Sequence, residues 1–152
     1  MIWHAEAAEP LQLQLPVRCE IGRDCFVQQY VDVDPGEGFK DYTCGQQSYD
    51  GHKGTDIRLR STADVALNVA VLAAADGVVK GGRDGMADQL VNSKPVPENV
   101  KDRECGNGVL IDHPGGWQTQ YCHMKRGSVR VKKGDVVRAC LLYTSPSPRD
   151  ED

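Results

Sequence analysis

The chain has 152 residues, of which 39% are hydrophobic and 26% are charged, and its formal net charge is −4. This length and composition are ordinary for a single globular domain. The sequence shows no basic patch of the kind that nucleic-acid-binding proteins carry, and no apolar run near the roughly 20 residues that a membrane-spanning helix needs. We therefore predict a protein that binds no nucleic acid and has no membrane span.

The chain begins with a polar segment that contains several Ala and Pro residues. Its first residues lack the basic and apolar regions of a signal peptide, so we identify no signal peptide in this sequence. We expect residues 1–16 to form a flexible arm.

Short strands are predicted next. Residues 25–31 and 55–59 mix apolar residues with polar ones as half-buried strands do. Residues 61–72 favour a short helix capped by a hydroxyl residue, although a loop that leads into a strand fits them equally well. Residues 69–74 and 77–81 are predicted to be two strands around a turn.

The remaining elements are a long loop and two hairpins. Residues 83–105 are polar and contain Pro, which indicates an inserted surface loop. Residues 108–113 and 117–123 alternate around a Pro-Gly-Gly turn and give the clearest hairpin. Residues 128–137 predict two more short strands around a Lys-Gly-Asp turn. The predicted fold class is therefore all-β, with mainly antiparallel pairing.

Six cysteines are many for a chain of this length. Their spacings form no Cys-x-x-Cys motif, so disulfides in an oxidising compartment are favoured over a zinc or redox motif. Cys19 can close a small loop with Cys25, and Cys105 can face Cys122 across the hairpin. Cys44 can pair with either early cysteine instead, and the sequence leaves this choice open.

The sharpest local feature is the segment Gly51 to Asp56, which reads GHKGTD. It offers an imidazole at His52 and a carboxylate at Asp56, and zinc accepts both kinds of ligand at about 2.0–2.2 Å. The glycines at 51 and 54 let the backbone bend so that both side chains can reach one ion. Taken alone, such a pair is also common on ordinary surfaces.

A second candidate stands at the end of the hairpin, where the sequence reads YCHM. Strand alternation predicts that His123 lies on the same face as Tyr121 and Thr119. From a cleft it could act as an acid, a base or an oxyanion partner. The plain alternative is a surface histidine near the end of a strand.

Five blocks in a fixed order, from about residue 51 to residue 139, resemble the LytM/lysostaphin-like zinc endopeptidases. They are HKGTD at 52–56, AADGVV at 74–79, GNGVLIDH at 106–113, TQYCHM at 119–124 and VKKGDVV at 131–137. The resemblance implies an antiparallel β-sandwich of the lysostaphin-like (duplicated hybrid motif) type. It also implies a periplasmic or secreted bacterial enzyme that hydrolyses peptide bonds in peptidoglycan.

The resemblance implies roles for three residues. His52 and Asp56 match the family's first two zinc ligands, so the expected cofactor is Zn²⁺. His123 matches the histidine of the family's Tyr-x-His block, which helps to stabilise the developing oxyanion. In such a site zinc polarises the scissile carbonyl and lowers the pKa of a bound water toward about 7.

One block of the family is missing from this sequence. Family members continue to a His-x-His strand that supplies the third zinc ligand and the general base, but no histidine follows His123 here. We expect His113 to be a surface turn residue and His4 to lie in the arm, so neither replaces the missing ligand. The 152-residue chain is therefore predicted to bind zinc weakly, if at all, and to be inactive.

The sequence also changes character after residue 139. We interpret residues 17–139 as a partial peptidase domain, incomplete at its C-terminal end, and residues 140–152 as a foreign or disordered tail. The sequence does not predict an oligomeric state.

Two other functions are compatible with parts of the sequence. A non-catalytic LytM-like module that binds wall peptides or a partner enzyme would share the fold, but such modules usually lose ligand residues. A biotinyl- or lipoyl-carrier module fits the strand-and-turn style of residues 73–79 and 131–137, but the chain has no Met-Lys-Met hairpin between them.

Overall fold

The computed structural model describes residues 10–89 and 97–140, which form two compact units. The first unit is Arg18–Val69, and the second contains the described residues before and after it. Residues 1–9 and 141–152 lie outside the described residues, and with them most of the predicted arm (1–16) and tail (140–152). These boundaries, and the domain range 17–139, stay predictions.

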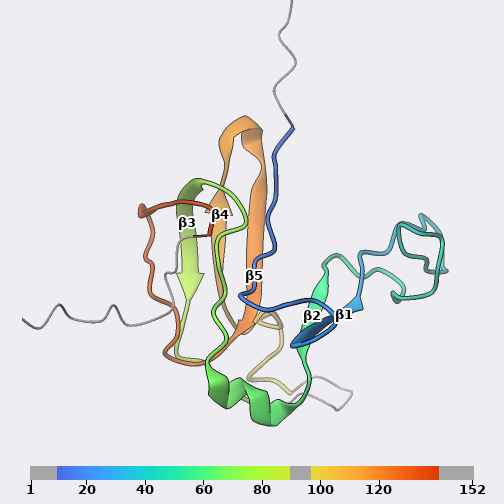
Figure 1. Ribbon diagram of the computed structural model, residues 1–152, viewed down its shortest axis with the longest axis horizontal. Coiled ribbons are helices and arrows are strands. Elements are labelled where there is room, and N and C mark those ends of the chain that lie inside the picture. Colours follow the sequence, from blue (N-terminus) through green and yellow to red (C-terminus); the bar gives the residue numbers. More distant parts are fainter. Residues whose placement is uncertain (1–9, 90–96, 141–152) are drawn as a thin grey trace, which may run out of the picture. The chain divides into compact units, whose positions relative to one another are not determined.

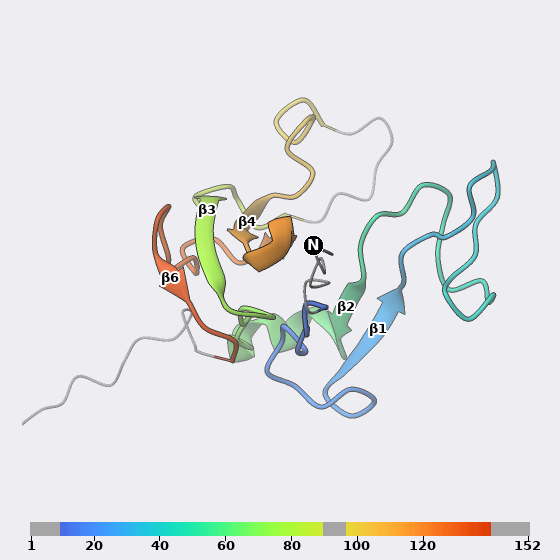
Figure 2. The same cartoon turned by 90° about the horizontal axis from the view of Figure 1, so that it is seen from above.

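The first unit contains a two-stranded antiparallel sheet (Figure 2). Its strands are β1 (Cys25–Gln29) and β2 (Asp56–Leu59), and Cys25 lies opposite Leu59. Both strands were predicted, and β1 ends two residues earlier and β2 begins one residue later than expected. Asp56, the predicted metal ligand, is the first residue of β2, so its backbone is fixed by pairing with β1.

The predicted helix is present only as a short 3-10 helix, η1 (Thr62–Leu67). The carboxylate of Asp64 accepts a hydrogen bond from the backbone N–H of Ser61 at 3.1 Å. An acidic side chain inside the first turn therefore binds the backbone at the start of the helix. After Leu67, residues 68–70 form a loop that leads to the β-bridge at Val71, so each alternative describes part of this segment.

The second unit contains a four-stranded antiparallel sheet in the order β5-β4-β3-β6, whose central strands run side by side in Figure 1. The strands are β3 (Gly77–Arg83), β4 (Asn107–Asp112), β5 (Gln118–Met124) and β6 (Val136–Val137). The predicted hairpin is confirmed as β4 and β5. The all-β, mainly antiparallel fold class is confirmed as well.

Two predicted pairings are wrong. Residues 69–74 were expected to pair with 77–81, but this segment contributes an isolated bridge between Val71 and Val17. β3 pairs instead with β4 and β6.

In the predicted hairpin at 128–137, the described structure has only β6. The reason lies in the turn, because Gly134 N–H donates to the carbonyl of Val79, and Val79 N–H donates to the carbonyl of Asp135. The turn therefore satisfies its backbone on β3 and not on a partner strand of its own.

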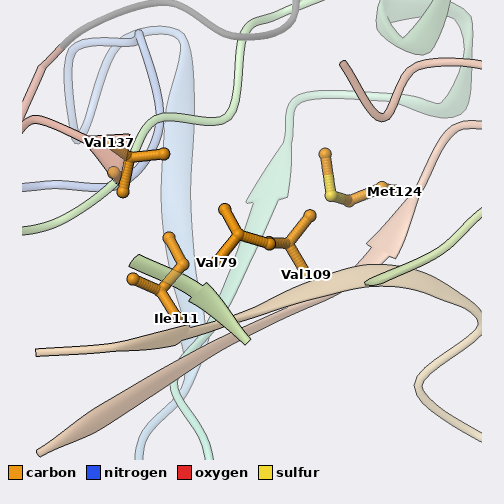
Figure 3. Close-up of a cluster of buried hydrophobic side chains, with 6 residues drawn as sticks. Val79, Val109, Ile111, Met124 and Val137 are labelled. Atoms are coloured by element: carbon orange, nitrogen blue, oxygen red, sulfur yellow. The ribbon is translucent and has the colours of Figure 1, made fainter. Parts of the chain in front are cut away.

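The core of the second unit is a cluster of buried apolar side chains on one face of this sheet (Figure 3). Val109 and Ile111 alternate along β4, so both point to the same side. Val79 lies opposite Ile111 in the register of β3 and β4 and is only 1% exposed. Met124 and Val137 complete the group that Figure 3 labels.

Two disulfides are present, as predicted from the number of cysteines. Cys19 is bonded to Cys25 in the first unit, and Cys105 to Cys122 in the second. Cys44 is free and exposed, so it is the early cysteine left out of the pairing.

The predicted loop at residues 83–105 has no regular element in its described parts, apart from Arg83 at the end of β3. The carboxylate of Asp84 accepts backbone N–H bonds from Gly85, Gly127 and Val129, which ties the start of this loop to the segment after β5. Residues 90–96 lie outside the described residues. Within the described ranges, no helix has the length and apolar character needed to cross a membrane.

Candidate metal centre

The two predicted metal ligands of the first unit lie together. His52 Nε2 is 3.4 Å from Asp56 Oδ2. The imidazole is almost completely buried, with 9% of its side chain exposed, whereas the carboxylate is 45% exposed. The pair therefore combines a buried ring nitrogen with a carboxylate oxygen that still reaches solvent.

Two contacts fix the ring of His52. Its Nδ1 lies 2.8 Å from the backbone carbonyl oxygen of Tyr30. Because a carbonyl oxygen can only accept, Nδ1 carries the proton and Nε2 keeps its lone pair in the neutral ring. The ring of Tyr49 stacks on the imidazole, with centroids 4.3 Å apart and planes 26° from parallel.

The backbone of His52 is held by Asp32. The N–H of Asp32 donates to the carbonyl of His52 at 2.8 Å, and the carboxylate of Asp32 accepts the N–H of Gly51 at 2.9 Å. Backbone N–H groups of Asp34 and Gly51 hold the pKa of Asp32 below its usual range. Gly51 has φ of 74°, a conformation that glycine adopts without strain, so the bend predicted at this glycine is present.

These residues fit two positions of a zinc site. Two atoms that are each about 2.1 Å from one tetrahedral zinc lie about 3.4 Å apart, which is the separation of His52 Nε2 and Asp56 Oδ2. The bond from Nδ1 to a carbonyl is also the usual second contact of a zinc-bound histidine. Among residues 10–89 and 97–140, however, no group of three or more His, Cys, Asp and Glu side chains is arranged to hold a metal ion.

His123 belongs to the second unit, on β5, and is exposed. Its φ is 58°, in the left-handed region, and its N–H donates to the carbonyl of Cys105 at 2.8 Å. Asn107 pairs with Met124 and Val109 with Tyr121, so two steps along β4 match three along β5. β5 therefore carries an extra residue beside His123, and strand alternation alone no longer decides which face its imidazole occupies.

His113 is not the surface turn residue that its neighbour Pro114 predicted, because it is 6% exposed. Its Nδ1 lies 2.7 Å from the carbonyl of Asp76 and its Nε2 lies 2.7 Å from Thr119 Oγ1. Thr119 Oγ1 is in turn 2.9 Å from the hydroxyl of Tyr121. Both ring nitrogens are therefore already bonded, which gives His113 a structural role in the sheet.

The second unit also has two hollows. One is a gap of about 30 Å³ beside the apolar core, bordered by Val71 and Val131 among others. The other is an open hollow of about 470 Å³ beside His113 and Arg138. Neither of these two hollows is lined by His123.

The sequence predicts His52 and Asp56 as a pair, and their side chains do lie together, but it does not predict the residues that hold His52. Tyr30 acts through its backbone carbonyl, which any residue could provide, so its identity carries no signal. Asp32 and Tyr49 offered only a weak one, as polar and aromatic residues in a turn-rich segment.

Comparison with known proteins gives one match. The model of peptidase family M23 matches residues 50–140, a range that includes His52, Asp56 and His123. The chain has no match among curated proteins or solved structures.

Proposed function

The chain belongs to peptidase family M23, the LytM/lysostaphin-like family, and we propose that it is the zinc-binding part of a metalloendopeptidase that hydrolyses peptide bonds in bacterial peptidoglycan. Membership makes the protein a hydrolase-type metallopeptidase at the level of the family. The finer statements, on zinc, on substrate and on individual residues, are our proposal.

The observation that carries the proposal is the pair His52 and Asp56. Their facing atoms are 3.4 Å apart, and the Nδ1 contact with Tyr30 leaves Nε2 free to donate its lone pair. Unlike His113, whose two ring nitrogens are both bonded within the sheet, His52 is buried and stacked with its Nε2 directed at a carboxylate. Fixing the ring costs side-chain entropy. Because the folded protein already holds the ring in place, this cost is not incurred again when a ligand binds.

The proposed roles follow from the chemistry of each side chain. His52 and Asp56 would hold the zinc through one nitrogen and one oxygen. The metal, when bound, would polarise the peptide carbonyl and acidify a water molecule. His123, which is exposed and able to donate a hydrogen bond, would stabilise negative charge on the carbonyl oxygen of the peptide.

The residues of this chain supply only part of a catalytic site. A catalytic zinc normally has three protein ligands, and no histidine follows His123 in the 152 residues. His113 cannot serve, since both of its ring nitrogens are bonded in the sheet. His4 lies outside the described residues. We therefore propose that this chain by itself binds zinc weakly and does not cleave peptides.

The lack of a third zinc ligand among these residues supports one alternative. This is a non-catalytic module of the same fold that binds wall peptides or a partner enzyme. Retention of His52, Asp56 and His123 favours the enzyme. The proposed compartment is periplasmic or secreted, because members of the family typically act there and the two disulfides need an oxidising environment.

The test is zinc binding by isothermal titration and metal analysis on the chain and on three variants. We expect one weak zinc site in the unmodified protein and its loss in both His52→Ala and Asp56→Ala. Asp50→Ala is the matched control, because Asp50 is an exposed acid two residues from His52, and its removal should leave the titration unchanged.

Each result separates the two functions. Zinc binding by His52→Ala equal to that of the unmodified chain would remove the proposed ligand and with it the enzyme assignment. An unmodified chain that holds no zinc but still sediments with purified peptidoglycan would support the non-catalytic module. Peptide cleavage by the unmodified chain would contradict the claim that a third ligand is needed.

A further inference from the structure

The segment that precedes His52 is built around two acidic side chains that accept backbone hydrogen bonds. Asp32 Oδ1 accepts the N–H groups of Asp34 and Lys40, at 2.9 and 3.1 Å. Its other oxygen, Oδ2, accepts the N–H of Gly51 at 2.9 Å. One carboxylate thus binds the backbone 2, 8 and 19 residues further along the chain.

Only the third of these bonds reaches the candidate metal centre. Gly51 immediately precedes His52, and the N–H of Asp32 bonds to the carbonyl of His52. Asp32 therefore holds the backbone on both sides of the peptide unit that presents the imidazole. With that unit fixed, Nδ1 meets the carbonyl of Tyr30 and Nε2 faces Asp56.

We propose that Asp32 is a positioning residue for His52, which sets the orientation and tautomer of this ligand before metal binds. The inference rests on the proposed function for its meaning, since His52 must be a ligand for its orientation to matter. The structural claim itself concerns only the ring, namely that the Oδ2 bond to Gly51 keeps the imidazole of His52 in place.

Replacing Asp32 by Asn tests this bond selectively. The amide oxygen can take the position of Oδ1 and keep the bonds from Asp34 and Lys40. The amide nitrogen then faces the N–H of Gly51, donor against donor, so this one bond is lost. The variant has nearly the same shape and differs in the contact with Gly51 and in the loss of one negative charge, a loss that Asp41→Asn shares.

The chain also contains a matched control. Asp41 Oδ1 accepts bonds from Thr43 and Gly45, while its Oδ2 accepts the N–H of Gln47 at 3.0 Å. Asp41→Asn therefore loses one backbone bond in the same way, but at Gln47 and not next to His52. A general loosening of the segment would appear in both variants, whereas a positioning effect would appear only in Asp32→Asn.

The primary readout is the ¹⁵N NMR spectrum of the imidazole groups in the metal-free protein at a pH where the rings are neutral. We expect a single tautomer of His52, protonated at Nδ1, in the unmodified protein and in Asp41→Asn. In Asp32→Asn the signals should move toward the average of two tautomers. Zinc affinity by calorimetry should fall about tenfold in Asp32→Asn, as is common when an outer contact of a ligand is lost, and stay unchanged in Asp41→Asn.

Ring signals in Asp32→Asn identical to those of the unmodified protein, or equal changes in both variants, would overturn the inference. These signals are recorded without metal. They therefore test the role of Asp32 even if His52→Ala shows that zinc binds elsewhere. If Asp32→Asn does not fold, the hydrogen-exchange rate of the Gly51 amide in the unmodified protein tests the inference instead. A Gly51 amide that exchanges as fast as an open amide would mean that the bond to Asp32 is not formed.

Discussion

Among the glycines in the strands of the second unit, Gly108 leaves the least room for a Cβ, and its replacement by Ala should be costly. A Cβ built at this position would lie 2.2 Å from the carbonyl oxygen of Tyr121 and 3.1 Å from Cys105 Sγ. Ordinary contacts between carbon and a carbonyl oxygen begin near 3.3 Å, so β4 and β5 would have to move apart by about 1 Å. The neighbour is backbone, and its strand is tied by the disulfide from Cys122, so it cannot simply rotate away.

Overpacking of this kind usually costs about 1–3 kcal/mol, and we expect the upper end for Gly108→Ala because of the fixed backbone. For a chain of this size, that loss corresponds to a fall in Tm of roughly 6–12 °C. Gly81→Ala is the control, because Gly81 lies in β3 and a Cβ there meets no atom within 4 Å. It should be neutral or stabilise the protein by up to about 1 kcal/mol, since glycine is unfavourable inside a strand.

The measurement is equilibrium unfolding in urea, followed by circular dichroism, for both variants and the unmodified protein. A Gly108→Ala protein within about 0.5 kcal/mol of the unmodified one would refute the reasoning, because the close approach of β4 and β5 could then not be as described. An equal loss in both variants would show that any side chain on this sheet is harmful, and that the contact with Tyr121 is not the cause.

Three further predictions concern stability. Val79→Ala should cost about 2 kcal/mol in urea unfolding because Val79 is 1% exposed, whereas Val78→Ala next to it, at 44% exposed, should cost less than about 0.5 kcal/mol. Replacing Cys105 and Cys122 together by Ser should cost about 3 kcal/mol, the loop-closure value for a sequence separation of 17 residues, and a midpoint equal to that of the oxidised protein would contradict it. The pKa of Asp41 is lowered from 3.8 to about 2, chiefly by the hydrogen bond from the Thr43 hydroxyl, so its contribution is complete above pH 3.8 and is lost as the pH falls through 2. Acid titration of Asp41→Asn should therefore show a shallower loss of stability between pH 4 and pH 2 than the unmodified protein.

The sequence predicted those elements whose signals are local. The hairpin of β4 and β5 has alternating residues on both sides of a Pro-Gly-Gly turn, so the pairing follows from neighbouring residues, whereas the register shift between Asn107 and Val109 does not. Residues 69–74 carry an equally apolar run, but an apolar run does not say which partner it takes. Its buried residues, such as Ala73, pack into the core while the hydrogen bonds of β3 go to β4 and β6.

In the candidate metal centre, too, the contacts between residues close in sequence were predicted and the long-range contacts were not. His52 and Asp56 are four positions apart, so their approach depends on a few dihedral angles and two glycines. Asp32 is twenty positions before His52, and its role depends on how the intervening segment folds back. The prediction that His113 is a surface turn residue was wrong because it rested only on the neighbouring residues in the sequence. The bonds that bury it, to Asp76 and Thr119, depend on the folding of the sheet.

The proposed weakness of zinc binding has a definite physical source. If His52 and Asp56 are the ligands, their fixed geometry means that little ordering entropy remains to be lost when the ion binds. The affinity would then be limited by the number of ligands and not by disorder of those present. Zinc at ten times its dissociation constant would still stabilise the folded chain by about 1.4 kcal/mol, a shift of several degrees in Tm. Thus even an incomplete site would leave a thermal signal that His52→Ala abolishes, whereas a surface pair with no ligand role would leave none.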